Sequence, residues 1–352
     1  MTDAILKREE QAILTLRQLY RSYGYGPYKM SRFEEYDLYV RSKDFLVSDQ
    51  IITFSGDRGK LMALKPDVTM SIVKNAPEEP GVIQKVYYNE NVYRDYREIM
   101  QAGLECVGDL GAYEIAEVTL LAAKSLALLG TEFVLDISHM GLISAVLDSC
   151  GLEGEQRKQA LDCLRRKNLQ SLEQLCGENG EKLMALASCH GTGREVKELL
   201  TTPEEFRAWS ELEDLLDLLE KAGFGGHVRL DFSVGNNMRY YNGVVFRGYL
   251  EGIPTSVLSG GQYDRLPRKL GRKAKAVGFA IYVDLLQELQ KAEAEAIVDT
   301  LILHDGTVDA KSLSAAAEKA ASEGTVLVTR NLPQDRSWKK LLRFEKGEAV
   351  TC

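Results

Sequence analysis

The chain has 352 residues, of which 45% are hydrophobic and 27% charged, and its formal net charge is −8. This length predicts two or three structural units, and the acidic balance disfavours a large nucleic-acid interface, which needs a basic face. Since there is neither an apolar run of about 18 residues nor the apolar stretch of a signal peptide, we expect a cytoplasmic protein without a membrane span.

The first 138 residues alternate between helical and strand patterns. Apolar residues at helical spacing predict the helices, and short β-branched runs bounded by turn residues predict the strands. The expected elements are a helix over 4–22, a hairpin over 48–70 with a helix starting at Pro66 and Asp67, strands over 82–94 and 99–107, a helix over 112–129 and a strand over 131–138. We interpret residues 1–138 as the first part of a core domain.

The pattern changes at residue 139. Leu, Glu, Lys and Gln dominate residues 139–225, which predicts short helices and a helical insertion. Strand patterns return in residues 226–292, the second part of the core, which ends in an amphipathic helix. Residues 293–352 predict a short α/β segment with a β-α-β pattern. Sequential strands joined by tight turns favour an α+β fold, in which helices flank a largely antiparallel sheet.

The cysteines and histidines show no metal-ligand spacing. The cysteines are Cys106, Cys150, Cys163, Cys176, Cys189 and Cys352. In a chain of this length without an export signal, we expect reduced thiols. The adjacent Cys189 and His190 are the nearest approach to a ligand pair, and we predict neither a metal nor a cofactor. A basic cluster at 265–275 is either a solvated loop or a contact with an anionic partner.

Gln101 and Glu105 lie within an otherwise apolar strand. Because side chains alternate along a strand, residues four apart point to the same face. From this pattern alone, the face is either the solvated side of an edge strand or the wall of a pocket for a small polar ligand.

Five segments in order carry a resemblance to a known family. They are KPDVTM at 65–70, YREIMQAGLECVG at 96–108, YYNGVVF at 240–246, LSGGQYD at 258–264 and AVGFAIYVDLL at 276–286. Over residues 8–290 the chain resembles the class II aminoacyl-tRNA synthetase core, specifically that of histidyl-tRNA synthetase.

The resemblance implies a histidine pocket. By the match of segments, Asp67 and Thr69 would meet the α-amine, Gln101 would lie near it, and Glu105 would meet the imidazole. The tyrosines that match the walls of the imidazole pocket are Tyr241 and Tyr263. This chemistry is consistent, since an ammonium and an imidazole N–H both need acceptors. Arg94 matches the motif 2 arginine and completes the predicted set of binding residues.

The same comparison implies that the ATP-activating groups are missing. Leu285 stands where motif 3 ends in an arginine, and Asn236 stands where an arginine of the histidyl branch belongs; Arg239 is a poor substitute. Only Asp95 and Tyr96 replace the long motif 2 loop. Since one positioned charge in a transition-state clamp is worth about 2 to 4 kcal/mol, these losses argue against synthetase activity.

A retained histidine pocket without ATP activation resembles the regulatory subunit family of ATP phosphoribosyltransferase. The resemblance implies a hetero-octamer with a short-form catalytic subunit, which makes phosphoribosyl-ATP in the first step of histidine biosynthesis. This chain would be needed for that activity, would self-associate and would transmit feedback inhibition by histidine, without binding tRNA. Two alternatives remain open: a divergent histidyl-tRNA synthetase-like enzyme and a stand-alone amino-acid sensor.

Overall fold

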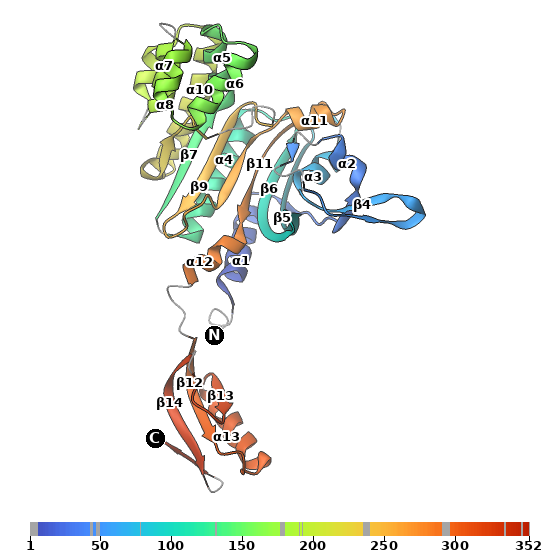
Figure 1. Cartoon of the computed structure of the whole chain (residues 1–352), viewed down its shortest axis with the longest axis vertical. Helices are drawn as coiled ribbons and strands as arrows, with labels where there is room; N and C mark the ends of the chain where they lie inside the picture. The colour runs from blue at the N-terminus through green and yellow to red at the C-terminus, as the bar shows by residue number, and fades with distance from the viewer. Residues whose placement is uncertain are drawn as a thin grey trace. The chain divides into compact units, whose positions relative to one another are not determined.

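The computed structural model is drawn in Figure 1. It describes residues 6–42, 45–46, 50–77, 79–130, 132–176, 180–189, 191, 193–234, 240–290, 296–333, 336–345 and 348–351. The chain divides into two compact units, Met1–Gln287 and Glu288–Cys352. The predicted tail segment, 293–352, falls within the second unit.

In the part of the chain that the structure describes, the first unit is built on an eight-stranded sheet. In sheet order the strands are β1 (Gly26–Pro27), β5 (Ile83–Arg94), β6 (Arg97–Gly108), β11 (Lys275–Tyr282), β10 (Leu258–Gln262), β9 (Val244–Leu250), β7 (Phe133–His139) and β8 (Val228–Leu230). The outermost pairs, β1–β5 and β7–β8, are parallel, and the pairings between them are antiparallel. The predicted α+β class, with its largely antiparallel sheet, is confirmed.

A two-residue turn joins β5 to β6. Its residues, Asp95 and Tyr96, have φ angles of 51° and 61°. Positive φ at both positions is the type I′ geometry, whose twist matches that of paired strands. The turn therefore lets β5 and β6 pair along their whole length, from Arg94 opposite Arg97 to Ile83 opposite Gly108.

Helices α1 (Arg8–Ser22) and α4 (Ala112–Leu129) contact one face of the sheet. Tyr20 of α1 shares a 3.0 Å hydrogen bond with Ser125 of α4, and its ring meets Phe279 of β11 edge-on at 6.0 Å. Leu104 of β6 is fully buried. Because β6 side chains alternate, Leu104 and its even-numbered neighbours face these helices while Gln101 and Glu105 face the other way.

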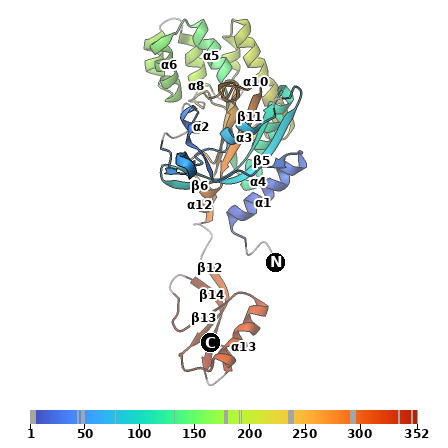
Figure 2. The same cartoon turned by 90° about the vertical axis from the view of Figure 1, so that its right-hand side faces the viewer.

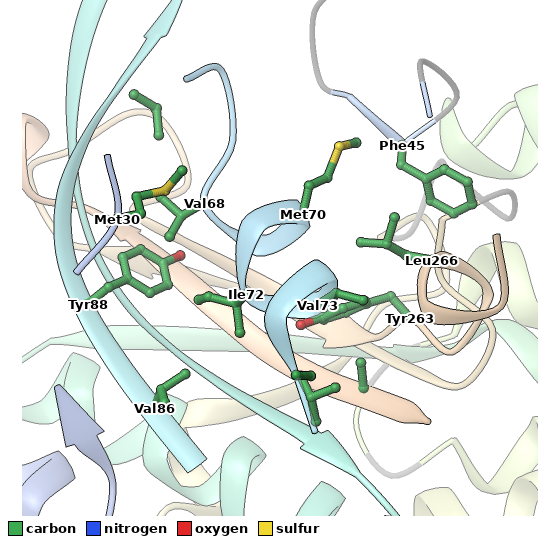
Figure 3. Packing of buried hydrophobic residues seen from close by; sticks show 14 of the residues in the cluster. Met30, Phe45, Val68, Met70, Ile72, Val73, Val86, Tyr88, Tyr263 and Leu266 are labelled. Carbon is green, nitrogen blue, oxygen red and sulfur yellow. The ribbon is translucent and has the colours of Figure 1, made fainter. Parts of the chain in front are cut away.

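The opposite face carries a smaller sheet and short helices. The described elements here are β2 (Phe33–Glu35), α2 (Tyr36–Val40), β3 (Thr53–Ser55), η2 (Asp57–Gly59), β4 (Leu61–Leu64), α3 (Thr69–Asn75) and α11 (Arg265–Lys269). Figure 3 shows Met70, Ile72 and Val73 of α3 among the buried side chains that include Tyr88 and Tyr263. This packing fixes α3, and hence Thr69 at its first position, over the sheet.

Six described helices lie between β7 and β8 in the sequence. They are α5 (Met140–Ser149), α6 (Gly154–Arg165), α7 (Leu169–Cys176), α8 (Glu181–Ser188), α9 (Arg194–Glu198) and α10 (Pro203–Lys221). Figures 1 and 2 show them gathered at one end of the eight-stranded sheet. The longest, α10, starts with a capping box, in which the Thr202 hydroxyl accepts from the Glu205 N–H at 3.2 Å. The other short elements are η4 (Gly225–His227), which leads into β8, η5 (Val283–Leu286), which follows β11, and α12 (Gln287–Gln290), which spans the boundary between the two units.

After α12, the second unit is a sheet with the helix α13. Its elements are β12 (Ala296–His304), α13 (Ala310–Glu323), β13 (Val326–Thr329), β14 (Arg336–Glu345) and β15 (Glu348–Thr351), in the sheet order β13-β12-β14-β15. Ala320 of α13 packs with Ile302 and Phe344. The predicted β-α-β pattern is present, but β14 and β15 were not predicted, because Lys and Arg interrupt the apolar residues of β14.

Several predicted boundaries were wrong. Helix α3 begins at Thr69 rather than at Pro66. Of the strand patterns expected over 226–292, the first, HVRLDFSV at 227–234, was interpreted as one strand, but β8 ends at Leu230, because Asp231 accepts the Ser233 N–H at 2.9 Å and turns the chain. Within the described residues, no helix has the length and apolarity needed to span a membrane.

Candidate functional site

A cavity of about 420 Å³ opens on the sheet face opposite α1 and α4. Its size is within the range of small-molecule sites. All seven residues predicted to bind a ligand line it: Asp67, Thr69, Arg94, Gln101, Glu105, Tyr241 and Tyr263. The structure therefore brings together side chains from β5, β6, α3 and the segments around β9 and β10. Gln101 and Glu105 both face the cavity, as their spacing predicts.

Two glycines in the strands beneath the cavity leave space at its base, or floor. A Cβ placed on Gly278 of β11 would overlap the Glu105 carboxylate and the Leu104 carbonyl. One placed on Gly103 of β6 would overlap the Phe279 carbonyl and the Tyr88 hydroxyl. Only glycine at these two strand positions leaves room for the polar side chains above.

Glu105 is the most deeply buried acid of the cavity, with 2% of its surface exposed. The Thr69 hydroxyl donates to one carboxyl oxygen at 2.7 Å, and the Tyr263 hydroxyl donates to the other. Burial raises the pKa of Glu105 to about 8, although these two hydrogen bonds oppose the shift and nearby Asp67 adds to it. No cation pairs with Glu105 among the described residues. A basic ligand group would supply the missing counter-charge.

Asp67 and Arg94 form a pair beside Glu105. The Arg94 Nη2 lies 3.5 Å from the Asp67 Oδ2, and its Nε donates to the Pro66 carbonyl at 2.5 Å. The Asp67 Oδ1 accepts the Met70 N–H at 2.8 Å at the start of α3. Burial raises the pKa of Asp67, while the Arg94 guanidinium opposes that rise. Arg94 thus holds the segment that leads into α3.

Four tyrosines make up much of the cavity wall. The Tyr240 ring lies 4.7 Å from that of Tyr241 and 5.4 Å from that of Tyr263. Burial raises the pKa of each of these hydroxyls and that of Tyr88, so they stay protonated and can donate hydrogen bonds. The rings provide flat apolar walls for a planar group.

Sequence reasoning missed several residues that line the cavity: Tyr88, Tyr240, Arg247, Ser256, Ser259 and Tyr282. Tyr240 directly precedes the predicted Tyr241 and could have been included with it. Arg247 follows Val245 by two positions, so strand alternation would have placed both on one face. Tyr88 is opposite Gly103 in the β5–β6 pairing, which depends on register.

Other predicted features have structural roles or lie outside the described residues. Arg272 of the basic cluster donates to the backbone carbonyls of Lys74 and Ala76, and Lys275 donates to that of Leu110 at 2.9 Å. Leu285 is half-buried in η5. Of the residues singled out in the sequence, Asn236, Arg239, His190 and Cys352 lie outside the described residues. The other five cysteines are free thiols, and the described residues contain no group of three or more His, Cys, Asp or Glu able to hold a metal.

Comparison with known proteins adds a family model and named relatives. A family model described as histidyl-tRNA synthetase matches residues 2–286. A protein of Clostridium acetobutylicum named ATP phosphoribosyltransferase regulatory subunit is 28% identical over 296 residues, which cover 77% of this chain and 72% of that protein. A protein of the same name from Syntrophotalea carbinolica is 29% identical over 364 residues, which cover 94% of this chain and 84% of that protein.

Solved structures show the same likeness. A structure described as an ATP phosphoribosyltransferase regulatory subunit/histidyl-tRNA synthetase from Bacillus halodurans is 26% identical, with a TM-score of 0.74 over 92% of this chain and 88% of the other. A chain of the ATP phosphoribosyl transferase (HisG:HisZ) complex from Thermotoga maritima is 18% identical, with a TM-score of 0.62 over 78% of this chain and 97% of the other. The second likeness concerns the fold alone.

Proposed function

This chain belongs to the histidyl-tRNA synthetase family, and from that premise we propose that it is a regulatory subunit of ATP phosphoribosyltransferase that binds histidine without activating it. The relatives of that name support the regulatory role in histidine biosynthesis. The catalytic partner is a short-form ATP phosphoribosyltransferase, in a complex of four subunits of each kind, and the complex acts in the cytoplasm.

The observation that carries the proposal is the combination of an amino-acid cavity with a closed β5–β6 hairpin. Glu105, Asp67, Thr69 and Gln101 line the cavity together with the tyrosine rings. In our proposal Glu105 binds the imidazole, and Asp67, Thr69 and Gln101 bind the α-amine. The two-residue turn between β5 and β6 leaves no loop to reach over a nucleotide.

Protonation gives Glu105 a defined role in binding. Its raised pKa keeps it largely protonated at neutral pH, so its O–H can donate to the unprotonated ring nitrogen of a neutral imidazole. An imidazolium would instead pair with the Glu105 carboxylate and form an ion pair inside the cavity. Such a pair is stronger away from bulk water than at an exposed surface.

Regulation then follows from linkage. Histidine shifts the complex towards the state that binds it more tightly, and a difference of about 1 to 3 kcal/mol in binding free energy suffices for a 5- to 150-fold effect. Feedback inhibition requires that this cavity bind histidine more tightly when the catalytic partner is in its less active state.

Reconstitution tests the proposal. A short-form ATP phosphoribosyltransferase should gain activity when this chain is added, and histidine should inhibit the mixture. The chain alone should not catalyse histidine-dependent exchange between ATP and pyrophosphate. Exchange activity would favour the divergent synthetase, and histidine binding without any effect on the phosphoribosyltransferase would favour a stand-alone sensor.

A further inference from the structure

Arg247 lines the cavity at a distance from Glu105. It lies on β9, opposite Ser259 of β10 on one side and Asp136 of β7 on the other. Across the sheet, Glu105 pairs with Gly278, Gly278 with Gly261, and Gly261 with Val245, two residues before Arg247. The two backbone positions are therefore about 14 Å apart across the strands and about 7 Å apart along them.

The acid opposite Arg247 in the sheet pairs with another residue. Asp136 is the cross-strand partner of Arg247, but Arg229 takes both carboxyl oxygens of Asp136, at 2.7 and 3.0 Å. No hydrogen bond or ion pair joins the Arg247 guanidinium to another residue that the structure describes. A half-buried arginine of this kind attracts an anion, because its charge is partly removed from water and lacks an internal partner.

The charges of the cavity thus leave one acid and one base without partners. Asp67 and Arg94 pair with each other. Glu105 accepts hydrogen bonds from hydroxyl groups alone, and Arg247 forms no ion pair with an acid among the described residues. The cavity therefore carries an unpaired acid and, some distance away over the same floor, an unpaired guanidinium. A ligand with a basic group at one end and an anionic group at the other complements both.

We propose that Arg247 binds the α-carboxylate of the amino-acid ligand, at the end of the cavity opposite Glu105. A guanidinium suits this role because its planar fork can donate two parallel hydrogen bonds to a carboxylate. Ser259, next to Arg247 across the strands, also lines the cavity, and its hydroxyl shares a hydrogen bond with Tyr241. The inference rests on the proposed function and deepens it, since it makes the cavity selective for an amino acid over the corresponding amine.

Calorimetry with two ligands tests this inference. Histamine keeps the imidazole and the amine of histidine but lacks the carboxylate. The full chain should bind histidine about 10- to 100-fold more tightly than histamine, as expected for hydrogen bonds to a charged group. Arg247→Met should weaken histidine binding by a similar factor and change histamine binding less than about threefold, and Arg247→Lys should restore part of the loss.

Arg194→Met is the matched control, because Arg194 is 85% exposed and, among the residues that the structure describes, pairs only with Glu198 on α9. It should bind both ligands like the unmodified chain, and thermal unfolding should show that each variant is folded. Unchanged histidine affinity in Arg247→Met, or an equal loss for both ligands, would overturn the role of Arg247 and leave the proposed function intact. If the unmodified chain bound no histidine, the proposed function would fail together with this inference.

Discussion

Glu105→Gln should change how the stability of the protein depends on pH. The substitution keeps the size of the side chain and its contacts with Thr69 and Tyr263, but it removes the ionisable group. Because Glu105 has a pKa of about 8 in the fold, against an ordinary value of 4.5, the unfolded chain ionises it first as pH rises. Its contribution to stability is therefore fully present below about pH 4.5 and is lost as pH rises towards 8.

The magnitude follows from the same two values. One pKa unit corresponds to about 1.4 kcal/mol, so the unmodified chain should lose about 3 kcal/mol of unfolding free energy from this group between pH 5 and 8. Glu105→Gln should lose none of this, and the difference between the two proteins should grow with pH. Other titrating groups are common to both proteins and cancel in the difference.

Denaturant unfolding at several pH values measures this difference. Trp209 is buried in α10 of the first unit, whereas Trp338 lies in the second. A Trp338→Phe background therefore restricts the fluorescence signal to the unit that contains Glu105. If the unfolding free energies of the two proteins ran parallel from pH 5 to 8, Glu105 would not be a buried, protonated acid.

Three further substitutions have defined outcomes. Gly278→Ala should weaken histidine binding at least tenfold in calorimetry, because the added Cβ would overlap the Glu105 carboxylate. The control Gly226→Ala, with open space around it, should bind histidine like the unmodified chain. Equal affinities of the two variants would contradict the close approach of Gly278 to Glu105. Tyr96→Gly should raise the unfolding free energy by about 0.5 to 1 kcal/mol in denaturant melts, since an exposed non-glycine residue at φ 61° is strained; a lower value would argue against the type I′ turn. Thr202→Ala should cost about 1 kcal/mol in the same assay by removing the cap of α10, and an unchanged value would show that the cap contributes nothing.

Local patterns were enough to predict much of the fold. The helix α4 ends at Leu129, before Gly130, as its apolar spacing predicts. The alternation along β6 correctly placed Gln101 and Glu105 on one face, because strand geometry leaves side chains four apart no other arrangement. These features depend on residues close together in the chain, so local sequence patterns are sufficient to predict them.

Features that depend on strand register could not be predicted. The competition of Arg229 for Asp136 arises only because β7 pairs with both β8 and β9. Arg247 stands out only once that pairing is known. Similarly, β14 is a strand because it pairs with β12, although its own basic residues do not favour an apolar strand pattern.

We propose that the cavity of this chain carries the histidine signal to the catalytic partner. The most direct measurement is the activity of the reconstituted phosphoribosyltransferase complex with and without histidine, for the unmodified chain and for Gly278→Ala. We expect a large inhibition ratio for the unmodified complex and a ratio near one for the variant. Equal inhibition of both complexes would place the histidine sensor elsewhere and contradict the account.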